Sequence, residues 1–324
     1  MKIFYKQIAI YTRLLKNFNR VAKIKSLYFY IYTMPIFGFL FYLIVRLLLK
    51  INSKKMIIFF LQHKIFLSSI RFLSIESRKT IGSILPKYND QNDNIQKNFT
   101  IDDKKNLELL NDLKEYGYIS LGKIFTDNEC ENFIQFLENK TCYNSQTAMQ
   151  SSGNQINFEL KKEKDNLKKN AYYCFNPEVT TNYEPFKKFI SSKKIISLID
   201  SYLNFKSEMY SSITWYNPQS NEDHYVHRKH RDHDDFKFLG MIIYWTNVDK
   251  NSGCLNIVEK SHEKSNQFKN KDLIGQAGTV YLVDFSSLHS GTKLINNHRI
   301  TSFIRFGKFF NHATVIDGWS HTPL

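Results

Sequence analysis

The chain has 324 residues, a formal net charge of +15 and 15% aromatic residues, enough for a sizeable core in one large domain or two smaller ones. The 12 glycines and 6 prolines are too few for collagen-like or low-complexity structure. The four cysteines form no CxxC pair and suggest no disulfide framework, which indicates free thiols in a reducing compartment: Cys130, Cys142, Cys174 and Cys254.

The positive charge is concentrated at the N-terminus. Residues 1–79 contain 15 Lys and Arg and one acidic residue, Glu76, whereas the rest of the chain holds 30 basic and 29 acidic residues. The body of the protein is therefore close to neutral. A nucleic-acid binder needs its basic surface on the folded domain, so nucleic acid is not an expected partner.

Two apolar stretches lie within this basic segment. Residues 27–45 form an uncharged run of 19 residues, long enough to cross a bilayer as a helix. Residues 56–73 are interrupted by charged side chains and are typical of an amphipathic or buried helix. Three interpretations stay open for the first run, namely a single span, an interfacial or re-entrant anchor, and a helical pair packed on the core. We expect residues 1–79 to be a helical membrane anchor that holds a cytoplasmic domain.

A polar linker and a helical region follow. Residues 80–104 are rich in Asn, Asp and Gln and predict a linker. The spacing of apolar residues predicts helices over 105–116 and 187–203, and Thr126 with Glu129 predicts a capped helix that runs to Leu137. A short strand is expected within 116–125, and residues 141–185 are polar and irregular.

The second half of the chain is rich in predicted strands. The runs expected to be strands are separated by turns such as Asp249–Gly253, and they span 238–248, 254–258, 279–285 and 299–306. Many strands with few helices predict a mainly β fold with an antiparallel jelly-roll or barrel core flanked by helices. We expect this domain to span 105–312, with a tail at 313–324.

A possible metal site lies within this domain. His230 and Asp232 are two residues apart, so on a strand they point to the same face, and His289 follows the strand predicted at 279–285. Two histidines and one carboxylate form the ligand set of non-haem Fe(II) sites that leave positions open for a 2-oxoacid and dioxygen. Arg299, ten residues after His289, is suited to bind the second carboxylate of the 2-oxoacid.

Two other interpretations of the histidines stay open. Histidines recur every three residues in this region, which is compatible with a solvated charged loop: His224, His227, His230 and His233. Imidazole also suits other metals, so a zinc site of several histidines is the second alternative.

The motifs of this half resemble the phytanoyl-CoA dioxygenase family over roughly residues 105–310. They are the segments HRDHDDFKFLGMIIYWTNVDKNSGCLNIVEKSH (230–262), GQAGTVYLVDFSSLHSGT (275–292) and HRITSFIRFG (298–307), with YGYISLGKIFTDNEC (116–130) upstream. Lys260 stands where many members have glycine, and Gly240 replaces a larger residue at the start of a core strand.

The resemblance implies a double-stranded β-helix (jelly-roll, cupin-like) fold with Fe(II) as cofactor and 2-oxoglutarate as co-substrate. By position it implies that His230, Asp232 and His289 bind the metal, and that Arg299 binds 2-oxoglutarate with a hydroxyl contact from Thr301. Related halogenases lack the carboxylate ligand, so Asp232 favours hydroxylation. The expected reaction hydroxylates a small-molecule, lipid or lipid-linked substrate with dioxygen and releases succinate and CO2.

Two further functions compete with this one. A membrane-tethered, non-catalytic β-barrel binding module would share the fold. A membrane di-iron hydroxylase would explain apolar segments beside many histidines, but it needs several spanning helices and multiple histidine boxes, whereas no long apolar run follows residue 75 and no HH pair occurs.

Overall fold

The computed structural model of the chain describes residues 103–144, 173–263 and 269–307 with short internal gaps, and a few positions within 43–51 and 77–81. The described helices from residue 103 onward are α8 (Asp103–Tyr116), α9 (Asp127–Leu137), α12 (Pro177–Thr181), α13 (Glu184–Ile190), α14 (Lys193–Leu203) and the 3-10 helix η4 (Tyr225–His227). The described strands are β1 (Tyr118–Lys123), β2 (Cys142–Asn144), β3 (Tyr173–Phe175), β4 (Glu208–Asn217), β5 (Leu239–Tyr244), β6 (Leu255–Val258), β7 (Asn270–Leu273), β8 (Thr279–Val283), β9 (His289–Gly291) and β10 (Arg299–Gly307).

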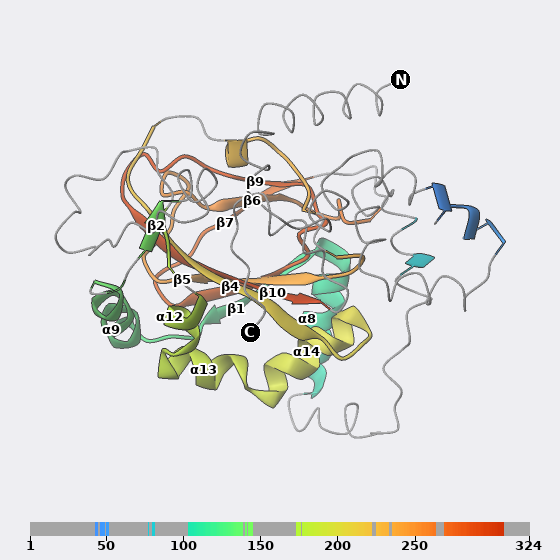
Figure 1. The fold of residues 1–324 in the computed structure, drawn as a ribbon, viewed down its shortest axis with the longest axis horizontal. Helices are drawn as coiled ribbons and strands as arrows, with labels where there is room; N and C mark the ends of the chain where they lie inside the picture. The colour runs from blue at the N-terminus through green and yellow to red at the C-terminus, as the bar shows by residue number, and fades with distance from the viewer. Residues whose placement is uncertain are drawn as a thin grey trace, which may run out of the picture.

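The strands form two antiparallel sheets. The large sheet has the order β1-β8-β5-β10-β4-β3-β2, and the small sheet has the order β7-β6-β9. Figure 1 shows the small sheet on one side of the large sheet and α12, α13 and α14 on the other. The fold is therefore mainly β with flanking helices and is consistent with a jelly-roll core, as predicted.

The two faces of the large sheet have different neighbours. On β10, Ile300 and Ile304 belong to the larger apolar core, which includes residues of α9 and α14. Phe303 packs instead against the core that includes residues of β6 and β7. Because side chains alternate along a strand, the face of β10 that carries Arg299, Thr301, Phe303 and Arg305 looks towards the small sheet.

Several local predictions are confirmed. The α9 helix begins with a capping box, in which the backbone N–H of Glu129 donates to Oγ1 of Thr126 and the Glu129 carboxylate accepts from the N–H of Thr126. The turn after β5 is held by Asp249, whose Oδ1 accepts from the N–H of Asn251 and the hydroxyl of Ser252. The four cysteines are free and buried.

Other local predictions need correction. The helix expected over 187–203 is two helices, α13 and α14, because Ser192 adopts an extended backbone (φ −61°, ψ 123°) between them. Serine competes for backbone hydrogen bonds and favours helix ends, so a continuous helical spacing does not exclude a break there. Within 141–185, expected to be irregular, the chain forms β2, β3 and α12. Strand β7 was missed because its sequence, Asn-Lys-Asp-Leu, is polar and half exposed.

The N-terminal predictions fall mostly outside the described residues. This applies to residues 1–42, to the second apolar stretch at 56–73, to most of the linker at 80–104 and to the tail at 313–324. Of the run at 27–45, only Leu43 and Ile44 are described, and both are helical. Among the helices that the structure describes, none is long and apolar enough to cross a membrane.

Candidate metal centre

The segment that carries His230 and Asp232 is bound to the chain around β9. The N–H of His230 donates to the carbonyl of His289 at 2.8 Å, and the N–H of His289 donates to the carbonyl of His230 at 2.9 Å. Two residues further, the N–H of Asp232 donates to the carbonyl of Phe285 at 3.0 Å. His230 thus forms an isolated bridge with His289, and Asp232 follows it outside any strand, so the two residues do not lie within a regular strand as predicted.

Further contacts fix this segment to the neighbouring loops. Arg231, between the two residues, donates through Nη1 to the carbonyls of Ser261 and Ser286. The hydroxyl of Ser261 accepts from the N–H of Leu288 at 2.7 Å, directly before His289. Ser261, in the Lys-Ser-His motif at 260–262, therefore helps to hold both parts of the candidate site together.

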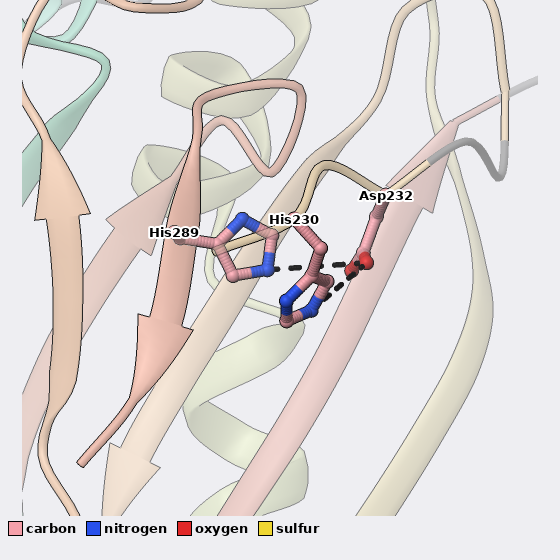
Figure 2. A group of neighbouring side chains, drawn as sticks. All are labelled: His230, Asp232 and His289. Atoms are coloured by element: carbon pink, nitrogen blue, oxygen red, sulfur yellow. Dashed lines mark ion pairs between the residues drawn. The ribbon is translucent and has the colours of Figure 1, made fainter. Parts of the chain in front are cut away.

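His230, Asp232 and His289 converge on one point (Figure 2). Oδ1 of Asp232 lies 3.7 Å from Nε2 of His230 and 3.9 Å from Nε2 of His289. The three donor atoms lie within 4.8 Å of one another, so the group could hold a metal ion. The side chain of His289 is 4% exposed and that of His230 is 36% exposed, so the site is closed on one side and partly open on the other.

Hydrogen bonds leave the Nε2 atoms of both imidazoles available as ligands. Nδ1 of His230 lies 2.8 Å from the carbonyl of Arg228, and Nδ1 of His289 lies 2.9 Å from the carbonyl of Ser287. A carbonyl only accepts, so each Nδ1 carries a proton, and in the neutral imidazole this leaves the lone pair on Nε2. Burial lowers the pKa of His289, and the Asp232 carboxylate only partly opposes this effect. The lowered pKa favours the neutral imidazole that a metal requires.

The residues present fit a six-coordinate metal with open positions. Bonds of about 2.1 Å at right angles place neighbouring donors about 3 Å apart, so the observed donors need to close by only about 1 to 2 Å, within reach of side-chain rotation. Of the four recurring histidines, only His230 belongs to this group, and His224 and His233 lie outside the described residues. Among the residues that the structure describes, the donor set thus contains two histidines and a carboxylate, which matches non-haem iron better than a zinc site of several histidines.

Arg305 contacts the other oxygen of the carboxylate. Its Nη2 lies 2.9 Å from Oδ2 of Asp232, and its guanidinium lies 5.5 Å from the centre of the Phe285 ring. The alternation along 299–306 predicts that Arg305 shares a face with Arg299, but sequence reasoning did not foresee this contact. The spacing of residues along the chain does not predict that Asp232 faces β10.

Phe285 packs against His289 and occupies space that Gly240 leaves open. The ring of Phe285 meets the imidazole of His289 edge to face, with centroids 4.9 Å apart. A Cβ on Gly240 would lie 2.0 Å from Cε2 of Phe285. The glycine that departs from the family pattern is therefore required here by the aromatic side chain that packs on His289.

Lys260, the other departure, occupies a position that suits glycine. Its φ is +60°, in the left-handed region that glycine adopts without cost. Its ammonium lies 2.6 Å from the carboxylate of Glu115 and 5.1 Å from the centre of the Tyr116 ring. These contacts are exposed and add little stability.

Arg299 and Thr301 lie further along the same face of β10. Arg299 is buried, and its Nε and Nη2 donate to Oδ1 of Asn217 at 3.2 and 2.9 Å. Its Nη1 donates to the carbonyl of Gly253, which the turn after β5 presents. Asn217 lies opposite Arg299 in the register of β4 and β10, and sequence reasoning missed it because an asparagine at a strand end carries no distinctive pattern.

Two buried polar atoms beside Arg299 have unused hydrogen-bonding capacity. Within the described part of the chain, Oγ1 of Thr301 and Nδ2 of Asn217 are buried and have no hydrogen-bond partner. Buried polar atoms in folded proteins nearly always have a partner, which can be a ligand. A hydroxyl and an amide donor next to a guanidinium form a set suited to a carboxylate.

A scan against models of known protein families finds no match, and a search of curated proteins finds none either. Solved structures do match. The non-heme alpha ketoglutarate dependent epimerase SnoN from nogalamycin biosynthesis is 11% identical with a TM-score of 0.47, over 63% of this chain and 83% of SnoN. AviO1 from Streptomyces viridochromogenes is 11% identical with a TM-score of 0.43, over 63% of this chain and 95% of AviO1. HygX from Streptomyces hygroscopicus, solved with nickel and 2-oxoglutarate bound, is 13% identical with a TM-score of 0.42, over 62% of this chain and 86% of HygX.

SnoN has also been solved in complex with Fe3+, alpha ketoglutarate and nogalamycin RO. The three TM-scores above are below 0.5, so the function of this chain has to be argued from its own residues. Without a matching family model, membership of the phytanoyl-CoA dioxygenase family stays an expectation that rests on the motifs.

Proposed function

We propose that this protein is an Fe(II)- and 2-oxoglutarate-dependent dioxygenase that hydroxylates a C–H bond of its substrate. The observation that carries the proposal is the convergence of Nε2 of His230, Oδ1 of Asp232 and Nε2 of His289 within 4.8 Å. These three atoms would hold the metal on one side and leave its other positions open. When bound, the iron would couple the decarboxylation of 2-oxoglutarate to succinate and CO2 with insertion of one oxygen atom into the substrate.

Arg299 is the proposed binding residue for the distal carboxylate of 2-oxoglutarate. It lies on the same face of β10 as Arg305, which contacts Asp232, so Arg299 and the candidate metal site lie on the same side of the large sheet. Thr301 and Asn217 would add a hydroxyl and an amide donor, which supports an anion site. Arg299 is buried, so water competes little for these contacts.

Hydroxylation is proposed over halogenation because Asp232 supplies the carboxylate ligand. A halide would need that coordination position, and here Asp232 would fill it from a segment held by three backbone hydrogen bonds. The proposed substrate is a small molecule or a lipid-like molecule. The basic, apolar N-terminal segment at 1–79 supports a lipid or lipid-linked substrate, because it would hold the domain at a membrane surface.

The test is succinate formation from isotopically labelled 2-oxoglutarate. The full chain, loaded with Fe(II) under anaerobic conditions and then exposed to dioxygen, is expected to release labelled succinate slowly even without substrate. The His289→Ala variant is expected to release none, because it lacks the most buried ligand. A wild-type chain that holds iron but never converts 2-oxoglutarate would favour the non-catalytic binding module on the same fold.

A further inference from the structure

The two oxygens of Asp232 face different partners. Oδ1 lies between the two imidazoles, at 3.7 Å from His230 and 3.9 Å from His289. Oδ2 accepts a charge-assisted hydrogen bond from Nη2 of Arg305 at 2.9 Å. One oxygen of the carboxylate therefore lies in the candidate metal site, and the other is hydrogen-bonded to a guanidinium.

Paired strands and an aromatic ring surround Arg305. Arg305 lies on β10, whose two neighbours in the sheet are β4 and β5, with Ser211 and Gly240 directly opposite it. Its side chain is 15% exposed and lies over the ring of Phe285, which fills the space beside Gly240. A side chain on a central strand that packs on an aromatic ring is well suited to hold a ligand in one orientation.

The contact of Arg305 with Oδ2 affects how the Asp232 carboxylate can bind a metal. A carboxylate can bind a metal through one oxygen or through both, and the second mode occupies one more coordination position. A guanidinium on the outer oxygen favours the first mode and fixes the rotation of the carboxylate. An open position is what a 2-oxoacid and dioxygen require.

We infer that Arg305 is a positioning residue that keeps Asp232 a one-oxygen ligand of the metal by holding Oδ2 away from it. This inference rests on the proposed metal site. It assigns Arg305 a role different from that of Arg299, which donates to Asn217 and to the carbonyl of Gly253 from the first residue of the strand. The two arginines of β10 thus have separate tasks.

A purely electrostatic role and a positioning role predict opposite changes in metal affinity when Arg305 is replaced. A positive charge beside a cation site repels the cation, so removal of that charge alone would strengthen metal binding. Loss of a residue that orients a ligand weakens metal binding, by about 10- to 100-fold for contacts of this kind. The direction of the change in affinity therefore distinguishes the two roles.

The experiment is a titration of the full chain with Co(II), followed by the visible absorption bands that report coordination number and geometry. The variants are Arg305→Met, which removes charge and donor, and Arg305→Lys, which keeps the charge and one donor. Lys271→Met on β7 is the control, because it removes one positive charge at an exposed position. His289→Ala reports on the metal site itself, and thermal unfolding of every variant without metal reports on folding.

We expect Arg305→Met to bind Co(II) about 10- to 100-fold more weakly than the wild-type chain and with altered bands. The Co(II) affinity of Arg305→Lys should lie between those of Arg305→Met and the wild-type chain, and the affinity of Lys271→Met should equal that of the wild type. Equal or tighter binding by Arg305→Met with wild-type bands would overturn the inference. If Arg305→Met does not fold, Arg305→Lys decides the matter, because wild-type affinity and bands in that variant would also overturn it.

A different result would contradict the metal site and not only the role of Arg305. If the wild-type chain bound no Co(II), or if His289→Ala bound it with wild-type affinity and bands, the assignment of the ligands would be wrong. The inference about Arg305 would then fall with the site on which it rests.

Discussion

At the scale of single residues, the candidate site depends on contacts that the sequence pattern only partly encodes. The spacing of His230 and Asp232 and the alternation on β10 predicted which side chains share a face. The pattern did not reveal that Oδ2 of Asp232 meets Arg305, or that Asn217 accepts from Arg299, because both contacts join residues more than 70 positions apart. Such pairings depend on sheet order, which a single sequence does not specify.

One prediction at this scale concerns Arg299. The Arg299→Lys variant should raise the KM for 2-oxoglutarate by about 10- to 100-fold, because a charge-assisted hydrogen bond is worth about 1.5–3 kcal/mol and lysine lacks the planar fork. Iron content should stay at the wild-type level, since Arg299 is not one of the three ligands. Steady-state succinate formation and metal analysis of the same samples check both statements.

The Thr301→Val variant is the matched control for this prediction. It removes a buried hydroxyl that has no partner within the described part of the chain, so a smaller rise in KM with no loss of folding stability is expected. An unchanged KM in Arg299→Lys would move the 2-oxoglutarate site away from Arg299.

At the scale of secondary-structure elements, the sequence predicted correctly those features that are set by hydrogen bonds between neighbouring residues. The capping box of α9 and the Asp249 turn formed as their sequences indicate. The segment of His230 and Asp232 was expected to be a strand, but it makes only an isolated bridge to His289. Its hydrogen bonds come from the tertiary arrangement of β9, so no local propensity marks it. The same reason explains why the polar strand β7, which exists through its pairing with β6, was missed.

The contact between β5 and Phe285 gives a prediction at this scale. In Gly240→Ala the added methyl would lie 2.0 Å from Cε2 of Phe285, so the ring must shift from its place against His289. Overpacking of this kind costs about 1–3 kcal/mol, and metal affinity should fall with it. Chemical denaturation and Co(II) titration measure the two effects.

Gly291→Ala on β9 is the control for this substitution. An added Cβ there would meet its nearest neighbour at 3.7 Å, an ordinary contact, so the stability should change by no more than about 0.5 kcal/mol. If Gly240→Ala were as stable as Gly291→Ala and bound metal normally, the packing role of Phe285 would be wrong.

At the scale of the whole molecule, the proposal combines a nearly neutral domain with a basic, apolar N-terminal segment. We predict that the full chain sediments with membranes and resists extraction by high salt, because residues 1–79 hold 15 basic residues and two apolar stretches. The measurement is sedimentation of membranes with and without 1 M salt, which shortens the Debye length from about 8 Å to about 3 Å and so weakens purely electrostatic attachment. Full-length protein that stays in the supernatant at low salt would contradict the anchor. In that case the N-terminal helices would pack on the domain instead.

The central claim is that His230, Asp232 and His289 bind one iron ion. The most direct measurement is the Fe(II) stoichiometry of the full chain and of His289→Ala, loaded anaerobically, desalted and analysed for metal. We predict close to one iron per wild-type chain and a nearly empty His289→Ala variant that remains folded, because the most buried of the three ligands is lost. Full iron occupancy in folded His289→Ala would contradict the account.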